Sequence, residues 1–421
     1  MRKLKITNFS CIQEADVSLN RLTILIGPQA SGKSVISKLF FFFFDLVNLQ
    51  RIAIEAGKDF DGFKILFKTK FLEQFPVSAW GEKKFVIWFQ SGRHEFKIIR
   101  STYNDNLSDN IRVSTSAALE EFYKVQADAY KKLSRRVTDP EMGEDVDVAL
   151  EFRTILTQGF SREQGADYVA SQLFIPAGRA FFTNMGRAIA AFEQSRLLDP
   201  LTVRFARLYT LYLDRYKNTY NRRIRESRSG SLGAGFEKLL GGKLITNEEG
   251  DYVTTPDGRR VPFLALSSGQ QELLPLIVTL ASLAPSLSRR GRLVYIEEPE
   301  AHLFPEAQSE LVEILGALIQ EKGLNTNLII TTHSPYVLSK LNNLMFGGDI
   351  VKRSASNSEA VAGILPAQSL LRSSVVNAYA IKGGVVENIK SKSGLIDAEY
   401  LDSVSGKIAE EFDALLGIED E

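Results

Sequence analysis

A glycine-rich segment constrains this chain more than any other feature, because its eight residues follow the spacing Gly-x4-Gly-Lys-Ser and read Gly27-Pro28-Gln29-Ala30-Ser31-Gly32-Lys33-Ser34. The apolar stretch before it, residues 22–26, is typical of a strand covered on both faces. The apolar stretch after it, residues 35–47, is typical of a buried helix and is too short to span a bilayer. In such a turn, successive backbone N–H groups face one phosphate beside the positive end of a helix. We therefore expect nucleotide binding, with Lys33 on the β- and γ-phosphates and the Ser34 hydroxyl on Mg²⁺.

Two acidic residues stand at the end of a second predicted core strand, residues 293–296. Carboxylates at the carboxyl end of a strand face the ligand crevice of such sheets. Glu297 is placed to hold Mg²⁺, directly or through a water, and Glu298 to polarise the water that attacks the γ-phosphate. The simpler alternative is a solvated acidic end of the strand.

A serine- and glycine-rich turn begins a further helix. Ser267 and Gln270, or Ser268 and Gln271, have the spacing of a capping box, so the simplest interpretation of this turn is a well-capped helix. Pro275 lies inside the apolar run that follows, and we expect it to kink or shorten the helix.

His333 follows another apolar strand, which ends at Thr332, one strand-helix-strand unit after the acids. Parallel strands joined in this way end at the same edge of a sheet, so His333 is expected on the strand next to the acids. There its imidazole can contact a γ-phosphate. A histidine with a purely structural role is the alternative.

These four elements, in this order, resemble the ABC-type ATPase module of the SMC, RecF and OLD-like branch. The resemblance implies an α/β fold of the P-loop NTPase class, with a mixed β-sheet core, an antiparallel β subdomain and an inserted helical lobe. It also implies bound ATP and Mg²⁺, with residues 27–34 as the Walker A loop. Ser267, Gly269 and Gln270 would form the signature loop. Glu297 would be the Walker B metal ligand, Glu298 the catalytic base and His333 the switch histidine.

Three positions depart from the usual pattern of this branch. Gln29 stands where relatives often have asparagine, Glu297 replaces the usual aspartate, and Ser268 replaces a signature glycine. The last two substitutions occur in OLD-like proteins. Because a longer acid moves the metal, the resemblance implies an ATPase that hydrolyses ATP slowly.

Two further residues keep more than one interpretation. The segment ending at Arg179 resembles part of some OLD-like ATPases, and Arg179 either approaches the nucleotide or forms a structural ion pair. Gln90 is a weak candidate for the glutamine of the family's Q-loop, which we leave unassigned.

In the resembling family, the signature loop caps the γ-phosphate held by another subunit, so the resemblance implies a homodimer or higher homo-oligomer assembled through ATP. It further suggests a switch that controls a separate effector protein, as in bacterial anti-phage and toxin systems. No Asp-x-Asp pair of a Toprim nuclease follows His333, so the effector is expected on another chain. The alternative is a DNA-binding repair ATPase of the RecF or SMC type, although equal counts of basic and acidic residues, 51 each, argue against a strong general affinity for DNA.

The expected organisation has four parts. Residues 1–102 hold the first part of the ATPase core and the β subdomain, including a hairpin over residues 84–99; residues 103–230 form the helical insertion without strands; residues 231–375 complete the core; and residues 376–421 add an edge-covering hairpin and a helix. In the insertion, the acidic run with Asp145 and Asp147 is expected to be solvated. The arginines at 222–228 are either a solvated helix end or a contact for phosphates.

The chain shows no apolar signal segment after its basic start, and its only cysteine is Cys11. These features predict a cytoplasmic protein without a membrane partner, in which Cys11 is a buried and inert thiol.

Overall fold

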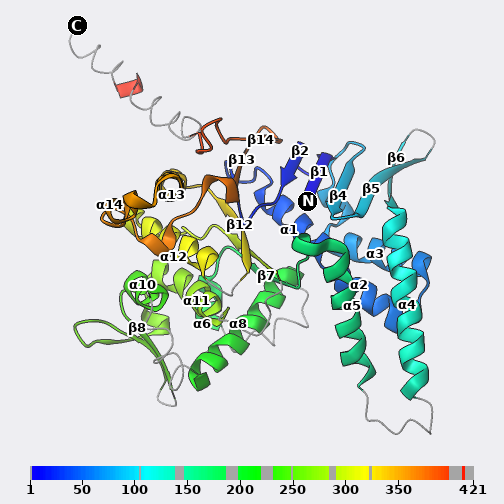
Figure 1. The fold of residues 1–421 in the computed structure, drawn as a ribbon, viewed down its shortest axis with the longest axis horizontal. Helices are drawn as coiled ribbons and strands as arrows, with labels where there is room; N and C mark the ends of the chain where they lie inside the picture. Colours follow the sequence, from blue (N-terminus) through cyan, green and yellow to red (C-terminus); the bar gives the residue numbers. More distant parts are fainter. Residues whose placement is uncertain are drawn as a thin grey trace.

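The computed structural model describes residues 2–103, 106–137, 147–185, 198–219, 231–247, 250–283, 291–321, 325–397 and 410–412. One mixed sheet of 11 strands organises this part of the chain (Figure 1). From one edge to the other, its strands are β6 (Asn106–Thr115), β5 (His94–Tyr103), β4 (Val86–Ser91), β1 (Arg2–Phe9), β2 (Ile12–Ser18), β14 (Val385–Asn388), β13 (Val376–Lys382), β3 (Leu22–Ile26), β12 (Thr326–Thr332), β11 (Arg292–Glu297) and β7 (Ser171–Ile175).

The sheet has an antiparallel part and a parallel part. The strands from β6 to β2 pair antiparallel with their neighbours, and the predicted hairpin is confirmed as β4 and β5. The strands from β13 to β7 pair parallel with one another, and β14 joins the two parts by pairing antiparallel with β13 and parallel with β2. The predicted α/β fold with a mixed sheet is therefore confirmed.

Helices cover both faces of the parallel strands, which explains their nearly continuous apolar sequences. Ile24 and Ile26 face one hydrophobic cluster, whereas Leu25 between them faces the other. The first cluster is built with α8 (Pro200–Thr219), α10 (Ser231–Leu240), α11 (Ser268–Ser282), α12 (Pro305–Gln320) and α13 (Pro335–Arg353). The second is built with α1 (Lys33–Phe44), α2 (Leu46–Glu55), α3 (Phe60–Gln74), α4 (Ala117–Val137) and α5 (Val148–Gln164).

The five consecutive phenylalanines of α1, residues 40–44, are all buried, as predicted. A helix that is apolar all round needs partners on every side, and α1 finds them in the sheet and in α3. Phe43 stacks on Phe89 of β4 with ring centroids 4.6 Å apart, and Phe42 packs against Phe67 and Phe71 of α3. This packing fixes the last turn of α1 against the sheet and α3.

The prediction of a strand-free insertion at residues 103–230 is wrong, because β6 and β7 lie within it. β6 is mostly polar and lies at one edge of the sheet, and β7 has only five residues. Neither strand therefore has the long apolar run of a central strand. Between these strands, α4 and α5 run side by side and project from the body of the molecule at the lower right of Figure 1.

Short elements complete the described chain. Asp147 caps the start of α5 by accepting hydrogen bonds from the backbone N–H groups of Ala149 and Leu150, whereas Asp145 and the arginines at 222–228 lie outside the described residues. The remaining helices are α6 (Ala180–Met185) and α14 (Ser358–Ala362), and short 3-10 turns occur at Val77–Ala79, Gly165–Asp167, Phe263–Ala265, Ala355–Asn357, Ala367–Ser369 and Ser373–Val375.

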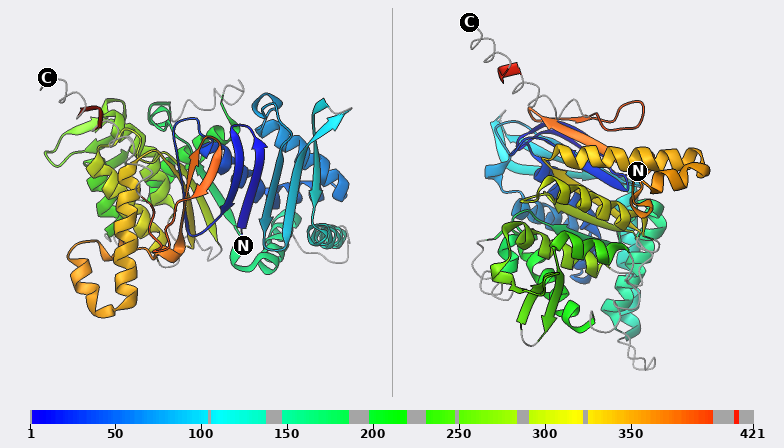
Figure 2. Two further views of the ribbon diagram at one scale, coloured as in Figure 1. Left: turned by 90° about the horizontal axis from the view of Figure 1, so that it is seen from above. Right: turned by 90° about the vertical axis from the view of Figure 1, so that its left-hand side faces the viewer.

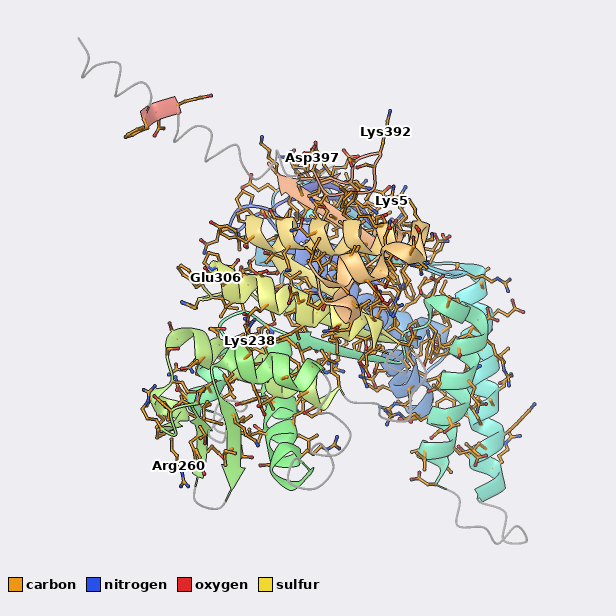
Figure 3. The ribbon with its side chains drawn as sticks, turned by 60° about the vertical axis from the view of Figure 1, so that its left-hand side comes forward. Lys5, Lys238, Arg260, Glu306, Lys392 and Asp397 are labelled. Carbon is orange, nitrogen blue, oxygen red and sulfur yellow. The ribbon has the colours of Figure 1, made fainter. Side chains whose placement is uncertain are left out.

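The short strands predicted near residues 243–263 are confirmed as a separate three-stranded sheet of β8 (Lys243–Asn247), β9 (Gly250–Thr254) and β10 (Arg260–Pro262). Figure 3 shows Arg260 on this sheet and Lys238 on the adjoining α10, away from Lys5 and Lys392. The small sheet leads directly into the turn that begins α11.

The prediction that the C-terminal hairpin covers an edge of the sheet is wrong. The hairpin lies in the middle of the main sheet. β13 pairs with β3, and β14 pairs with β2 through Val385 and Glu14 (Figure 2). The contact with the glycine-rich loop is close, because a Cβ on Gly27 would stand 2.6 Å from the carbonyl oxygen of Ile381. Most of the predicted C-terminal helix, residues 398–409 and 413–421, falls outside the described residues.

Cys11 is exposed, which corrects the prediction of a buried thiol. It lies in the tight turn between β1 and β2, where Ser10 has a positive φ of 55°. Over the described ranges, no helix is both long and apolar enough to cross a bilayer.

His94 is a buried histidine that joins β5 to the α4–α5 pair. It packs against the rings of Phe122 and Phe160, and its Nδ1 lies 3.3 Å from the side-chain nitrogen of Gln164. Burial, with a smaller contribution from Arg93, lowers the pKa of His94 from 6.5 to about 4. The neutral imidazole is therefore the form that the folded protein accommodates.

We expect the free energy of unfolding to fall as the pH decreases from about 6.5 to about 4, since the unfolded chain takes up a proton that folded His94 resists. This group contributes up to about 1.4 kcal/mol per pH unit within that window and nothing above it. Urea unfolding across this pH range should show a shallower dependence for His94→Gln. An identical dependence for both proteins would contradict the assignment.

Candidate functional site

Three neighbouring parallel strands, β3, β12 and β11, end at the same edge of the main sheet. The glycine-rich loop, residues 27–34, follows β3, His333 follows β12, and Glu298 follows β11. The predicted neighbourhood of these segments is confirmed by the strand order. The carboxyl ends of parallel strands form the ligand crevice of open α/β sheets.

The ammonium of Lys33 is buried at the centre of this edge. Its Nζ donates to the carbonyl oxygens of Gly27 and Pro28, both at 2.8 Å, and lies 3.4 Å from Nδ1 of His333. Burial lowers the pKa of Lys33, while the carboxylates of Glu298, Glu300 and Glu297 oppose this change. The glycine-rich loop therefore holds a cation that faces three carboxylates.

His333 connects Lys33 to Glu298. Its Nε2 lies 2.8 Å from Oε1 of Glu298. Because an ammonium only donates hydrogen bonds, Nδ1 accepts from Lys33, and Nε2 carries the proton that is donated to the carboxylate. Glu298 has a φ of 43°, in the left-handed region that costs a residue with a side chain roughly 1 kcal/mol. The line from Lys33 through His333 to Glu298 is a polar network at the edge of the sheet.

Glu300 supports His333 from below, and the sequence reasoning did not identify this function. Its Oε1 accepts hydrogen bonds from Oγ1 of Thr332 at 2.6 Å and from the backbone N–H of His333 at 2.7 Å. The residue is buried. The sequence shows a third acid two positions after Glu298, but the direction in which the Glu300 side chain points could not be inferred from the spacing.

Glu297 is a buried carboxylate with one oxygen left over. It is 8% exposed, and its Oε1 has no hydrogen-bond partner, as is also true of the buried hydroxyl of Ser31. Burial raises the pKa of Glu297, partly offset by the Ser34 hydroxyl and the Lys38 ammonium. Such unpaired polar atoms beside a glycine-rich loop fit a cation at Glu297 and Ser34 and a phosphate at the loop.

The signature segment, residues 267–270, begins α11 with a complete capping box. The Ser267 side chain accepts from the N–H of Gln270, and the Gln270 side chain accepts from the N–H of Ser267. Ser267 is exposed, and no hydrogen bond among the described residues joins this segment to the glycine-rich loop. Of the predicted site residues, Ser267, Gly269 and Gln270 thus stand apart from the Lys33 network.

The signature segment nevertheless contacts the loop that follows Glu298. A Cβ on Gly269 would stand 2.8 Å from the carbonyl oxygen of His302, so a larger residue does not fit there. One expectation was that Pro275 shortens α11, but the helix continues from Ser268 to Ser282. The carbonyl of Gln271, which Pro275 cannot bond, accepts the hydroxyl of Thr183 at 2.7 Å, and the helix continues.

The two residues with open interpretations have structural partners. Arg179 is fully buried and forms an ion pair with Glu272 of α11, with Nε and Oε2 3.5 Å apart. The side-chain nitrogen of Gln90 lies 3.3 Å from both the Gly92 carbonyl and the Glu95 carboxylate, within the β4–β5 hairpin.

Three of the solved structures that are similar to this chain are SMC head domains. At 13% identity, the SMC head domain from Thermotoga maritima covers 92% of this chain and 97% of its own, with a TM-score of 0.36. An SmcHead bound to the C-winged helix domain of ScpA is 13% identical, covers 92% of this chain and 96% of its own, and has a TM-score of 0.40. An Smc head domain with an extended coiled coil, bound to the C-terminal domain of ScpA derived from Pyrococcus furiosus, is 13% identical. It covers 98% of this chain and 100% of its own, with a TM-score of 0.36. With TM-scores below 0.5, these similarities support no inference about function.

Comparison with curated protein sequences returns no match. A sequence profile described as "AAA domain, putative AbiEii toxin, Type IV TA system" matches residues 22–339, which is more than half of the 421 residues. This match spans β3, the glycine-rich loop, the signature segment, both acids and His333. The chain therefore belongs to this family of AAA domains.

Proposed function

We propose that this protein binds ATP with Mg²⁺ and hydrolyses it slowly, as a switch that assembles with further copies of itself through the nucleotide. The network of Lys33, His333 and Glu298 at the carboxyl edge of β3, β12 and β11 supports this proposal most directly. It combines a cation for phosphates, a neutral imidazole and a carboxylate base within one connected set.

Each residue has a distinct task in the proposed reaction. Lys33 exchanges the carbonyls of Gly27 and Pro28 for phosphate oxygens. Glu298 accepts the proton of the attacking water, and His333 orients that carboxylate through its Nε2–H. Ser34 and Glu297 hold Mg²⁺, which supplies positive charge to the phosphates when it is bound.

The exposure of Ser267 supports a composite site between subunits. The N-terminal end of α11 carries a partial positive charge and lies at the surface, apart from the glycine-rich loop of its own chain. A second copy can therefore place this end against the γ-phosphate. Hydrolysis removes that contact, so nucleotide turnover opens the assembly.

The proposed role of the switch is control of a separate effector, within a bacterial toxin or anti-phage system of the OLD-like kind. The description of the matching family as a putative toxin of a type IV toxin-antitoxin system supports this class of role. Purification of the tagged protein from its native host, with ATP and with the Glu298→Gln variant, tests whether a second protein accompanies the closed assembly.

Lys33→Ala should weaken ATP binding by at least about 100-fold, or about 2.7 kcal/mol, because Lys33 is the only buried lysine among the residues that the structure describes. Cys11 provides a direct measurement, since it is the only cysteine, is exposed, and lies so close that a Cβ on Gly32 would stand 2.9 Å from its sulfur. ATP should slow maleimide labelling of Cys11 in the wild type and in the surface control Lys70→Ala. Protection of Lys33→Ala at the same ATP concentration would refute the assignment.

Glu298→Gln should slow hydrolysis at least tenfold, a barrier increase of about 1.4 kcal/mol or more, while ATP binding and assembly persist. The amide still accepts the hydrogen bond from His333 but cannot take a proton from water. Phosphate release and size-exclusion chromatography with ATP measure the two properties, with the exposed Glu306→Gln as control. Wild-type turnover in Glu298→Gln would mean that another base acts.

Glu297→Gln should raise the Tm without nucleotide, because it removes a carboxylate charge that burial disfavours. The same variant should bind Mg²⁺ at least about tenfold more weakly in the presence of ATP, a loss that even indirect partners of metal ligands can cause. Thermal unfolding with ATP and EDTA, and then with added Mg²⁺, separates these effects. An unchanged Mg²⁺ response would place the metal elsewhere.

A further inference from the structure

Arg179 is the most deeply buried arginine near the site, and its position suggests more than packing. It lies between β7 and α6, with 0% exposure, and its ion-pair partner Glu272 on α11 is 3% exposed. Taking two such charges out of water is expensive unless geometry and hydrogen bonds compensate. The surrounding contacts show what this pair holds together.

The guanidinium of Arg179 joins α11 to the end of β11. Its Nη1 donates to the carbonyl of Glu297 at 2.7 Å and to that of Pro176 at 3.0 Å, and its Nη2 donates to the carbonyl of Glu298 at 3.0 Å. Its Nε donates to the carbonyl of Glu272 at 3.1 Å. Four carbonyls from three segments therefore meet one planar group.

The Glu272 carboxylate fixes the backbone around Arg179 in return. It accepts the N–H of Arg179 at 2.8 Å and the N–H of Ala180 at 3.1 Å, one on each oxygen. The segment after β7 is thus bonded to α11 through main chain and side chain together. This arrangement leaves little freedom for α11 to move alone.

Two of the four bonded carbonyls belong to Glu297, the proposed metal ligand, and Glu298, the proposed base. Glu298 holds a strained backbone with φ of 43°, and such a conformation persists only where neighbours enforce it. Arg179 contacts its carbonyl directly, and the close approach of Gly269 to His302 restrains the following loop. The helix that carries Ser267 therefore borders the base of its own subunit through two contacts.

We propose that Arg179 is a positioning residue, which ties α11 to the Glu297–Glu298 peptide and thereby keeps the Glu298 carboxylate in place for hydrolysis. The inference rests on the proposed ATPase function. It adds that a movement of the signature segment against a neighbouring subunit is transmitted to Glu298 through this side chain. A lysine cannot replace it, since one ammonium cannot serve carbonyls arranged around a planar fork.

Arg179→Lys tests this inference in the chain of 421 residues. We expect the turnover per bound ATP to fall at least tenfold, while the affinity for ATP changes by less than about threefold, because Arg179 touches neither the glycine-rich loop nor Lys33. Bound ATP is measured by equilibrium dialysis, so loss of folded protein does not mimic lower turnover.

Arg100→Lys is the matched control. Arg100 is also buried and donates to two carbonyls, those of Gly81 and Ser108, but it lies on β5. It should lose stability without losing turnover per bound ATP. Equal losses of turnover in the two lysine variants would overturn a positioning function for Arg179.

Glu272→Gln keeps the inference testable if Arg179→Lys does not fold. It removes the ion pair and leaves a single side-chain oxygen, which can accept only one of the two backbone N–H groups, so turnover per bound ATP should again fall while ATP affinity is kept. Turnover within twofold of the wild type in a folded variant of either residue would overturn the inference. Failure of the ATPase proposal is recognised separately, by the absence of phosphate release from ATP in the wild type.

Discussion

The parallel pairing of β3, β12 and β11 is the constraint on which the rest of this structure depends. These strands are apolar on both faces, so their register is fixed by two hydrophobic clusters rather than one. Their carboxyl ends then coincide, and the glycine-rich loop, His333 and Glu298 meet without any long-range polar design. The chemistry of the edge follows from the burial of the strands.

That edge concentrates opposite charges in a small volume. Lys33 faces Glu297, Glu298 and Glu300, and burial acts against the charged forms of both Lys33 and Glu297. The carbonyls of Gly27 and Pro28 and the imidazole of His333 compensate the cation. The acids are compensated unequally, because Glu297 and Glu300 each retain one unpaired buried oxygen, whereas Glu298 accepts the hydrogen bond from His333. This inequality distinguishes the proposed metal ligand from the base.

Much of the site was predictable because it depends on patterns along the chain. A glycine-rich turn after an apolar strand, acids after the next such strand and a histidine one unit later determine an order of strand ends. Glu300 and Arg179 were not predictable in this way, since their functions depend on side-chain directions across segments far apart in sequence. β7 was missed because a five-residue strand at a sheet edge gives little periodic signal. Likewise, nothing in the sequence of the C-terminal hairpin identifies β3 and β2 as its neighbours.

The central position of β13 and β14 in the sheet has a consequence for folding during synthesis. These strands come near the end of the chain, yet they join the antiparallel part of the sheet to the parallel part. While the ribosome is still making residues 376–388, β2 and β3 expose unpaired edges, which are templates for aberrant pairing with other chains. The nascent protein therefore remains vulnerable until residues 376–388 have been synthesised and β13 lies beside Gly27.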